Sequence, residues 1–338
     1  MKKTSKEIVL DTLEFKNVER APRDLWLLPW AGINYPTKLE QILSDFPEDI
    51  IEMELTCCEP SPVAYGDQHE IGESVDAWGC KFVNLKRGII GEVKEPIVRG
   101  DEWEDTTAVH IPYEKLNFKI EDFNKDRESK GLNDKFVIMG SPRPFEQLQF
   151  MRGTENLYMD LVYQPTKMFE FIEKMHAFNC EYLEKIAKTN VDGLFFLDDW
   201  GSQKSLLINP AMWREIFKPM YRDFISIAKK HGKKAFMHSD GYILDIIPDL
   251  IDLGLDALNC QIFCMGVDKL KQFKGKITFW VKLIANTFFR LEMKKIQEKP
   301  FVRFMKIYMQ TVDVLLNANL VRAQNPKTFA LYLMNGII

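Results

Sequence analysis

Residues 233–263, KKAFMHSDGYILDIIPDLIDLGLDALNCQIF, decide the fold of this chain. A short apolar run at 235–237 is followed by the polar tetrad HSDG at 238–241. Apolar residues then recur at helical spacing over 243–253, and a second apolar run ends at Asn259. This change of period predicts a strand, a helix and a second strand. In parallel α/β folds catalytic groups lie where strands end, so we expect the tetrad to belong to an active site.

The composition is that of a globular protein with a sizeable core. The 338 residues could form one large α/β barrel or two smaller domains, with 46% hydrophobic and 28% charged residues. A net charge of -4 offers no general attraction for nucleic acid or an anionic membrane. The six cysteines lack the spacing of a zinc ribbon or a disulfide framework, which favours a reducing cytoplasm. The first residues contain no apolar segment, so we expect neither a signal peptide nor a membrane span.

Strands and helices alternate along most of the chain. Residues 38–122 are the exception, because their short apolar runs and turns favour inserted hairpins. The predicted strands are 25–28, closed by a loop at 29–32, then 136–139, 194–197 and 276–280. The predicted helices are 4–17, 168–188 and 209–231, the last kinked at Pro219. This alternation is typical of a (β/α)8 barrel or a doubly wound sheet.

His238 and Asp240 are the first candidates for chemistry. A histidine at a strand end can bind a metal or act as a general acid or base, because its pKa lies near neutrality. The alternative is that His238 only orders its loop while Asp240 caps the following helix. Both interpretations stay open, since motifs this short occur by chance.

Other polar and aromatic residues follow the neighbouring strands. Asp198 and Asp199 are consecutive, so we expect only one to enter the mouth of the fold, the other forming a turn. Trp200 and Trp280 could wall a flat ligand or simply pack. Arg143 lies between two prolines and could clamp a carboxylate or phosphate, with a surface salt bridge as the equal alternative.

Cys260 and Cys264 follow the second strand of the opening stretch. With His238 they could form a thiolate-imidazole zinc set, although free buried cysteines are common. The chain has no glycine-rich phosphate loop, no GxSxG and no HExxH. Nucleotide and protease chemistry are therefore excluded from the hypotheses.

Five stretches together resemble the uroporphyrinogen decarboxylase superfamily, whose members are (β/α)8 barrels and include corrinoid-linked methyltransferases. They are RAP at 20–22, VDAWGC at 75–80, DDWG at 198–201, WREIFKP at 213–219 and HSDG at 238–241. The resemblance extends to Trp280. It implies a barrel with an inserted N-terminal region over residues 1–280.

The first strand departs from the decarboxylases proper. They carry Arg-Gln-Ala-Gly-Arg there, which grips substrate carboxylates, whereas this chain has Pro29-Trp30-Ala31-Gly32-Ile33. Two charge-assisted partners for a porphyrinogen are therefore missing. Uroporphyrinogen-type decarboxylation in tetrapyrrole biosynthesis remains the alternative function, with Asp199 or Asp240 steadying a protonated pyrrole.

The resemblance favours methyl transfer between a corrinoid, carried by a partner protein, and a small acceptor. The zinc-dependent members carry His-x-Cys-Gly where this chain has HSDG, so His238 and Asp240 are the expected ligands of a zinc ion. Asp199 would handle charge or protons. The residues expected to contact the substrate are Trp30, Arg143, Trp200, Gln203, Asn259 and Gln261.

The resemblance stops after Trp280. Read one nucleotide earlier, the codons possible for residues 281–287 permit Gly-Glu-Ile-Asp-Arg-Gln-His, the sequence that the family carries there. The same shift over residues 308–329 permits the family's last strand and final helix. We therefore expect residues 281–338 to be an out-of-frame tail, produced by a lost G, and an inactive product is a further alternative. A barrel whose last strand cannot pair would expose backbone and core.

Overall fold

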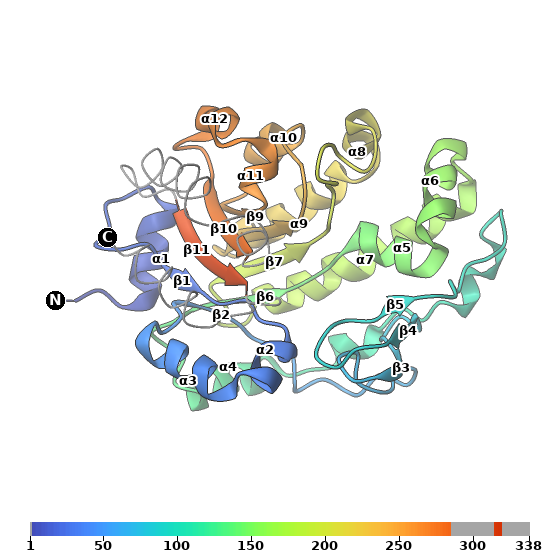
Figure 1. Cartoon of the computed structure of the whole chain (residues 1–338). Coiled ribbons are helices and arrows are strands. Elements are labelled where there is room, and N and C mark those ends of the chain that lie inside the picture. Colours follow the sequence, from blue (N-terminus) through green and yellow to red (C-terminus); the bar gives the residue numbers. More distant parts are fainter. Residues whose placement is uncertain (1, 285–313, 320–338) are drawn as a thin grey trace.

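The chain folds as an α/β barrel with an attached small sheet (Figure 1). The computed structural model describes residues 2–284 and 314–319. Within these residues eight parallel strands run in the order β1-β11-β10-β9-β8-β7-β6-β2. The strands are β1 (Arg23–Asp24), β2 (Ile50–Glu52), β6 (Phe136–Gly140), β7 (Gly193–Leu197), β8 (Lys234–Ser239), β9 (Ala257–Cys260), β10 (Thr278–Ile284) and β11 (Val314–Asn319). The backbone N–H of Asp49, next to β2, donates to the carbonyl of Arg23 in β1 at 2.8 Å and links the two ends of the curled sheet.

Helices follow the strands and cover the outside of the sheet. They are α1 (Ser5–Leu13), α2 (Pro29–Asn34), α3 (Pro36–Asp45), α4 (Ile120–Ser129), α5 (Pro144–Arg152), α6 (Thr154–Tyr163), α7 (Thr166–Ala187), α8 (Pro210–Ile216), α9 (Lys218–Lys230), α10 (Ile247–Asp252), α11 (Ile262–Met265) and α12 (Val267–Leu270). Short 3-10 turns occupy Glu104–Ala108, Tyr113–Leu116 and Lys271–Phe273. None of the helices in the described part of the chain has the length and apolar character needed to cross a membrane.

The inserted region forms its own antiparallel sheet. It consists of β3 (Gly72–Val75), β4 (Lys81–Asn84) and β5 (Glu92–Val93), and it lies beside α5 and α7 at one side of the barrel (Figure 1). The expectation of hairpins in residues 38–122 is confirmed, but the same region also supplies the barrel strand β2.

The barrel interior is filled by alternate residues of the strands. Phe136, Phe195, Phe236 and Trp280 belong to one buried cluster, because side chains two apart on a strand share a face. Helix α1 adds apolar side chains to that cluster and so closes one end of the barrel. Its start is fixed by a capping box in which Thr4 and Glu7 satisfy each other's backbone N–H groups.

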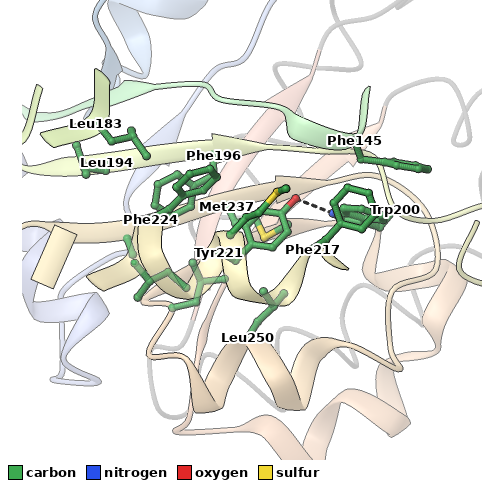
Figure 2. Close-up of a cluster of buried hydrophobic side chains, with 14 of the residues drawn as sticks. Phe145, Leu183, Leu194, Phe196, Trp200, Phe217, Tyr221, Phe224, Met237 and Leu250 are labelled. Atoms are coloured by element: carbon green, nitrogen blue, oxygen red, sulfur yellow. Dashed lines mark hydrogen bonds between the residues drawn. The ribbon is translucent and has the colours of Figure 1, made fainter. Parts of the chain in front are cut away.

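The outward-facing strand residues pack against the helices. Leu194 and Phe196 of β7 and Met237 of β8 meet Phe224 of α9 in this outer layer (Figure 2). The pattern explains why residues 235–237 and 194–197 were visible as apolar runs, since strands covered on both faces have few polar positions.

Three predicted elements are wrong in detail. The first strand is Arg23–Asp24, and residues 25–28 that follow are irregular. Residues 29–32 belong to helix α2, which starts with a proline at its first position. The kinked helix is divided at Phe217 into α8 and α9, because Pro219 sits in the first turn of the second helix.

The predicted tail is described only in part. Residues 281–284 continue β10 beyond Trp280, and Val314–Asn319 forms β11 between β10 and β1. The segments 285–313 and 320–338, with most of the residues on which the reading-frame argument depends, lie outside the described residues. The frame hypothesis stays a prediction.

Candidate active site at the carboxyl ends of β7, β8 and β9

One layer of inward-facing side chains lies at the upper end of the barrel strands. Strand register pairs Leu197 with His238, His238 with Asn259, and Asn259 with Trp280. The loops after β7 and β8 add Asp199 and Asp240 above this layer. Polar groups from separate parts of the sequence are thus brought together where barrel enzymes carry their active sites.

His238 is the centre of the arrangement. It is buried, and its Nδ1 is 2.7 Å from the side-chain oxygen of Asn259. Its Nε2 is 3.3 Å from Oδ1 of Asp199 and 3.7 Å from Oδ1 of Asp240. The ring of Trp26 contacts the imidazole edge to face, with 4.7 Å between centroids. These contacts fix the imidazole in one orientation, with Nε2 turned toward the two carboxylates.

Two glycines bring the two carboxylate loops together. A Cβ on Gly241, whose φ is 82°, would lie 1.9 Å from the carbonyl oxygen of Gly201. The Gly201 N–H donates to the carbonyl of Asp240 at 3.1 Å, and the Asp240 N–H donates to Oδ1 of Asp199 at 2.8 Å. Only glycine permits this approach, so the polar tetrad ends in Gly241 for a structural reason.

The ligand atoms of Asp199, His238 and Asp240 all lie within 4.8 Å of one another. When Nδ1–H donates to Asn259, the lone pair of Nε2 faces two carboxylates. That arrangement is repulsive unless a proton or a cation lies between them. The side chains of Asp199 and Asp240 are 43% and 27% exposed, so the group is open to solvent. One imidazole and two carboxylates, with room for water, fit a catalytic zinc site.

A second protonation pattern fits the same atoms. If the amide of Asn259 is turned over, its nitrogen donates to Nδ1 of His238, and Nε2–H then donates to Asp199. In that state His238 and Asp199 form an acid-base pair without a metal. The site is therefore suited to metal binding or to acid-base catalysis. A proton on Nδ1 of His238 favours metal binding, and a proton on Nε2 favours acid-base catalysis.

Asp198 and Trp200 face away from this site. Asp198 is fully buried, accepts from the backbone N–H groups of Phe145 and Glu146 at the start of α5, and accepts from the hydroxyl of Tyr221 at 2.6 Å. The expectation that only one of the two aspartates enters the mouth is confirmed. The other aspartate, Asp198, was expected to form a turn, but it holds the start of α5 instead.

Trp200 has no exposed surface. Its indole stacks on Phe145 at 4.3 Å and donates its N–H to the hydroxyl of Tyr221 at 2.9 Å (Figure 2). The side chain therefore packs between the barrel and its helices and does not line the mouth. Trp280 is likewise buried, inside the barrel.

The other predicted substrate residues lie in different places, some at the site and some beside the insertion. Asn259 is buried beside His238, and its amide nitrogen has no hydrogen-bond partner among the described residues. Gln203 and Gln261 are joined at the rim by a hydrogen bond of 3.2 Å. Trp30 lies near the insertion instead, with the ammonium of Lys86 5.8 Å from its ring centre. Arg143 caps α5 and lines a cavity on the side of the insertion.

Two further carboxyl groups face the site, and the sequence did not reveal them. Desolvation by the surrounding barrel atoms raises the pKa of Glu52, at the end of β2, to about 7, although the residue keeps an exposed surface. Arg143 and His238 oppose this shift of the pKa and Glu54 adds to it. Burial also raises the pKa of Glu146 in the first turn of α5, and the charges of Asp199 and Asp240 add to that effect. A carboxyl group with a pKa of about 7, such as Glu52, is suited to proton transfer near neutral pH.

The cysteine hypothesis is wrong for the described residues. Cys260 alternates with Asn259 along β9, so it points outward into the helix layer, and burial holds its pKa well above the usual range. Cys264 donates to the carbonyl of Gln261 at 2.9 Å. Neither thiol belongs to the group around His238.

Parallel strands curled into a barrel, with titratable residues at their carboxyl ends, are the features of the (β/α)8 barrel enzymes, and this chain has both. The family model described as Uroporphyrinogen decarboxylase (URO-D) matches residues 74–275, more than half of the chain. The chain belongs to this family.

One solved structure shares the fold over nearly the whole chain. A methyltransferase from Methanosarcina mazei superposes with a TM-score of 0.67 at 12% sequence identity, covering 99% of this chain and 98% of the other. The 3-keto-D-glucoside 4-epimerase YcjR from E. coli aligns with a TM-score of 0.39 at 13% identity, covering 64% of this chain and 83% of its own. No curated protein matches the sequence.

Proposed function

We propose that this chain transfers a methyl group between a corrinoid, carried by a partner protein, and a small acceptor. The observation that carries the proposal is the convergence of Asp199, His238 and Asp240 at the mouth of the barrel. Family membership and the fold shared with a methyltransferase support it. The carboxylates take the place of the cysteine ligands that the resemblance leads one to expect at a zinc site.

Asp199, His238 and Asp240 would hold the zinc. Bound there, it would supply Lewis acidity that lowers the pKa of the acceptor's reacting group. Asn259 keeps the proton of His238 on Nδ1 and so leaves Nε2 available as a ligand. Glu52, with a pKa of about 7, can take up the proton that the acceptor loses. Gln203 and Gln261 bridge the rim and can orient the acceptor.

Metal content and turnover test the proposal together. We expect about one zinc per chain by mass spectrometry of the purified full chain, and loss of methylcobalamin absorbance in the presence of an acceptor. His238→Ala and Asp199→Asn should lose both properties. His231→Ala is the matched control, because His231 pairs with Glu184 away from the mouth. Turnover by metal-free protein would refute the zinc role.

A second candidate function is decarboxylation of a porphyrinogen or a smaller acid. The observation that favours it is the protonated state available to Glu52, which can return a proton to carbon after carbon dioxide leaves. Pro29 and Ile33, in place of two arginines, argue against a substrate with many carboxylates. Formation of coproporphyrinogen from uroporphyrinogen, retained after removal of metal by a chelator, would favour this candidate over methyl transfer.

A further inference from the structure

Two adjoining cavities lie between the inserted region and the barrel. Their volumes are about 220 Å³ and about 170 Å³, and both are lined by Lys115, Gly140, Ser141 and Tyr182. The larger cavity extends along the insertion, and the smaller one reaches Glu52 at the end of β2. Together they form a recess that starts beside the candidate active site and continues under the small sheet.

Two cations line the larger cavity, and neither is held in a close ion pair with a described residue. Lys115 comes from the 3-10 turn Tyr113–Leu116 of the insertion, and Arg143 precedes α5 of the barrel. Neither side chain makes an ion pair of 4.0 Å or less, or a hydrogen bond, with any described residue. Burial lowers the pKa of Lys115, and the charges of Asp76 and Glu114 oppose this shift. The charge of Arg143 adds to the lowering of this pKa and is the smallest of these effects. Two like charges that line one cavity repel, and an anion bound between them would remove that repulsion.

The charges around the larger cavity indicate the charge of that anion. Within the described part of the chain, Asp76 is the one carboxylate that lines it, and its oxygens already accept from the backbone N–H groups of Trp78 and Cys80 and from the amide of Gln147. Among the residues that line this cavity, Lys115 and Arg143 with Asp76 leave one net positive charge, while Glu52 and Glu54 of the smaller cavity add negative charge at the other end of the recess. A singly charged group matches this balance, whereas a dianion such as phosphate would leave an excess of negative charge.

One wall of the larger cavity is aromatic, and the side chains of Gln68, Gln147 and Asn179 add polar groups to the lining. Trp78 contacts Phe178 edge to face with 5.4 Å between centroids, and Phe178 stacks on Tyr182 at 6.1 Å. Phe82 and Phe150 also line the cavity. Such a wall favours a flat or apolar organic body over a fully hydrated ion.

We infer that Lys115 and Arg143 form a subsite for the carboxylate of a small, partly apolar organic acid, whose body lies against the aromatic wall. This inference deepens the proposed function by giving the acceptor a chemical class. Arg143 interacts electrostatically with Glu52 and Glu146, and both of these sense the charge of His238. The smaller cavity continues from Lys115 to Glu52, so a molecule anchored at the subsite can extend toward the end of β2, where Glu52 senses the charge of His238.

Binding of 4-fluorobenzoate to the full chain, followed by fluorine NMR at pH 7, tests the subsite without any turnover. We expect saturable binding, at least tenfold weaker in Lys115→Met and in Arg143→Gln, because each change removes a charged hydrogen-bond donor. Lys119→Met is the matched control, since Lys119 is an exposed lysine four residues further along that does not line the cavity. It should bind like the wild type.

Two measurements on the unaltered chain cover the case in which the variants fail to fold. The neutral isostere 4-fluorobenzamide should bind at least tenfold more weakly than the acid, and inorganic phosphate should displace the acid poorly. Equal binding of acid and amide, or tighter binding of phosphate, would overturn the inference. His238→Ala should keep the affinity for 4-fluorobenzoate, so failure of the methyl-transfer proposal and failure of the subsite are separable.

Discussion

The hydrogen bond between His238 and Asn259 makes the sharpest prediction about the candidate metal site. Asn259→Ala removes the acceptor that keeps the proton on Nδ1 at 2.7 Å and leaves a buried imidazole N–H unpaired. Loss of such a supporting hydrogen bond typically weakens metal binding by about 10- to 100-fold, which corresponds to about 1.4–2.7 kcal/mol. Asn259→Asp still offers an acceptor to Nδ1–H, so its affinity should stay within about threefold of the wild type.

Zinc affinity is measured by competition with a chromophoric chelator at pH 7.5, and folding of each variant is checked by urea denaturation. Asn84→Ala is the matched control, because Asn84 is a buried asparagine whose side chain makes three hydrogen bonds in the small sheet, away from the barrel mouth. The control should lose stability and keep its zinc affinity. Unchanged affinity in Asn259→Ala, or equal losses in Asn259→Ala and Asn84→Ala, would refute the reasoning.

Three further predictions concern stability. Glu52 has a folded pKa of about 7 against 4.5, so it stabilises the fold below pH 4.5 and loses this contribution as the pH rises to 7. The full pKa shift corresponds to about 3 kcal/mol in the free energy of unfolding, and solvent screening reduces it to about 1 kcal/mol. Glu52→Gln should remove this part of the pH dependence of stability, measured by urea denaturation. Tyr221→Phe removes a hydroxyl with two buried partners and should cost about 2–4 kcal/mol by urea denaturation. Gly241→Ala should cost several kcal/mol and abolish zinc binding, whereas Gly232→Ala, at a φ of 65° with open space around it, should cost about 1 kcal/mol by the same assays.

Strand parity explains which parts of the site could be predicted from the sequence. His238 and Asn259 face inward because each lies two residues after an inward-facing residue, Phe236 or Ala257, near the end of a strand whose apolar run is visible in the sequence. Asp199 follows the same rule. Asp198 and Trp200 are two residues apart and therefore share the opposite face. Because side chains alternate between the two faces of a strand, Trp200 cannot point into the mouth if Asp199 does. That exclusion was available from the sequence.

Other site residues had no signal of this kind. Glu52 ends a strand of three residues in a region where short runs and turns obscure any period. Glu146 lies in the first turn of α5, where an acidic residue is expected for reasons of helix stability alone. Lys115 reaches its cavity from the insertion, and only the packing of the small sheet on the barrel brings it near Arg143. Long-range packing, which one sequence does not encode in its local pattern, places all three.

The reading frame after Trp280 determines how well the side chains of the last strands pack in the closed barrel. In the described backbone, β11 pairs with both β10 and β1, so its residues must fill the closing positions of the sheet. Side chains at closing positions contribute most when they are matched to their neighbours in the barrel. If one G is missing, the chain with Gly-Glu-Ile-Asp-Arg-Gln-His after Trp280 should unfold cooperatively and at a clearly higher temperature than the present chain. Resequencing across the codons of Trp280 and Val281 gives the direct answer, and an unchanged sequence together with cooperative unfolding of the present chain would refute the frame hypothesis.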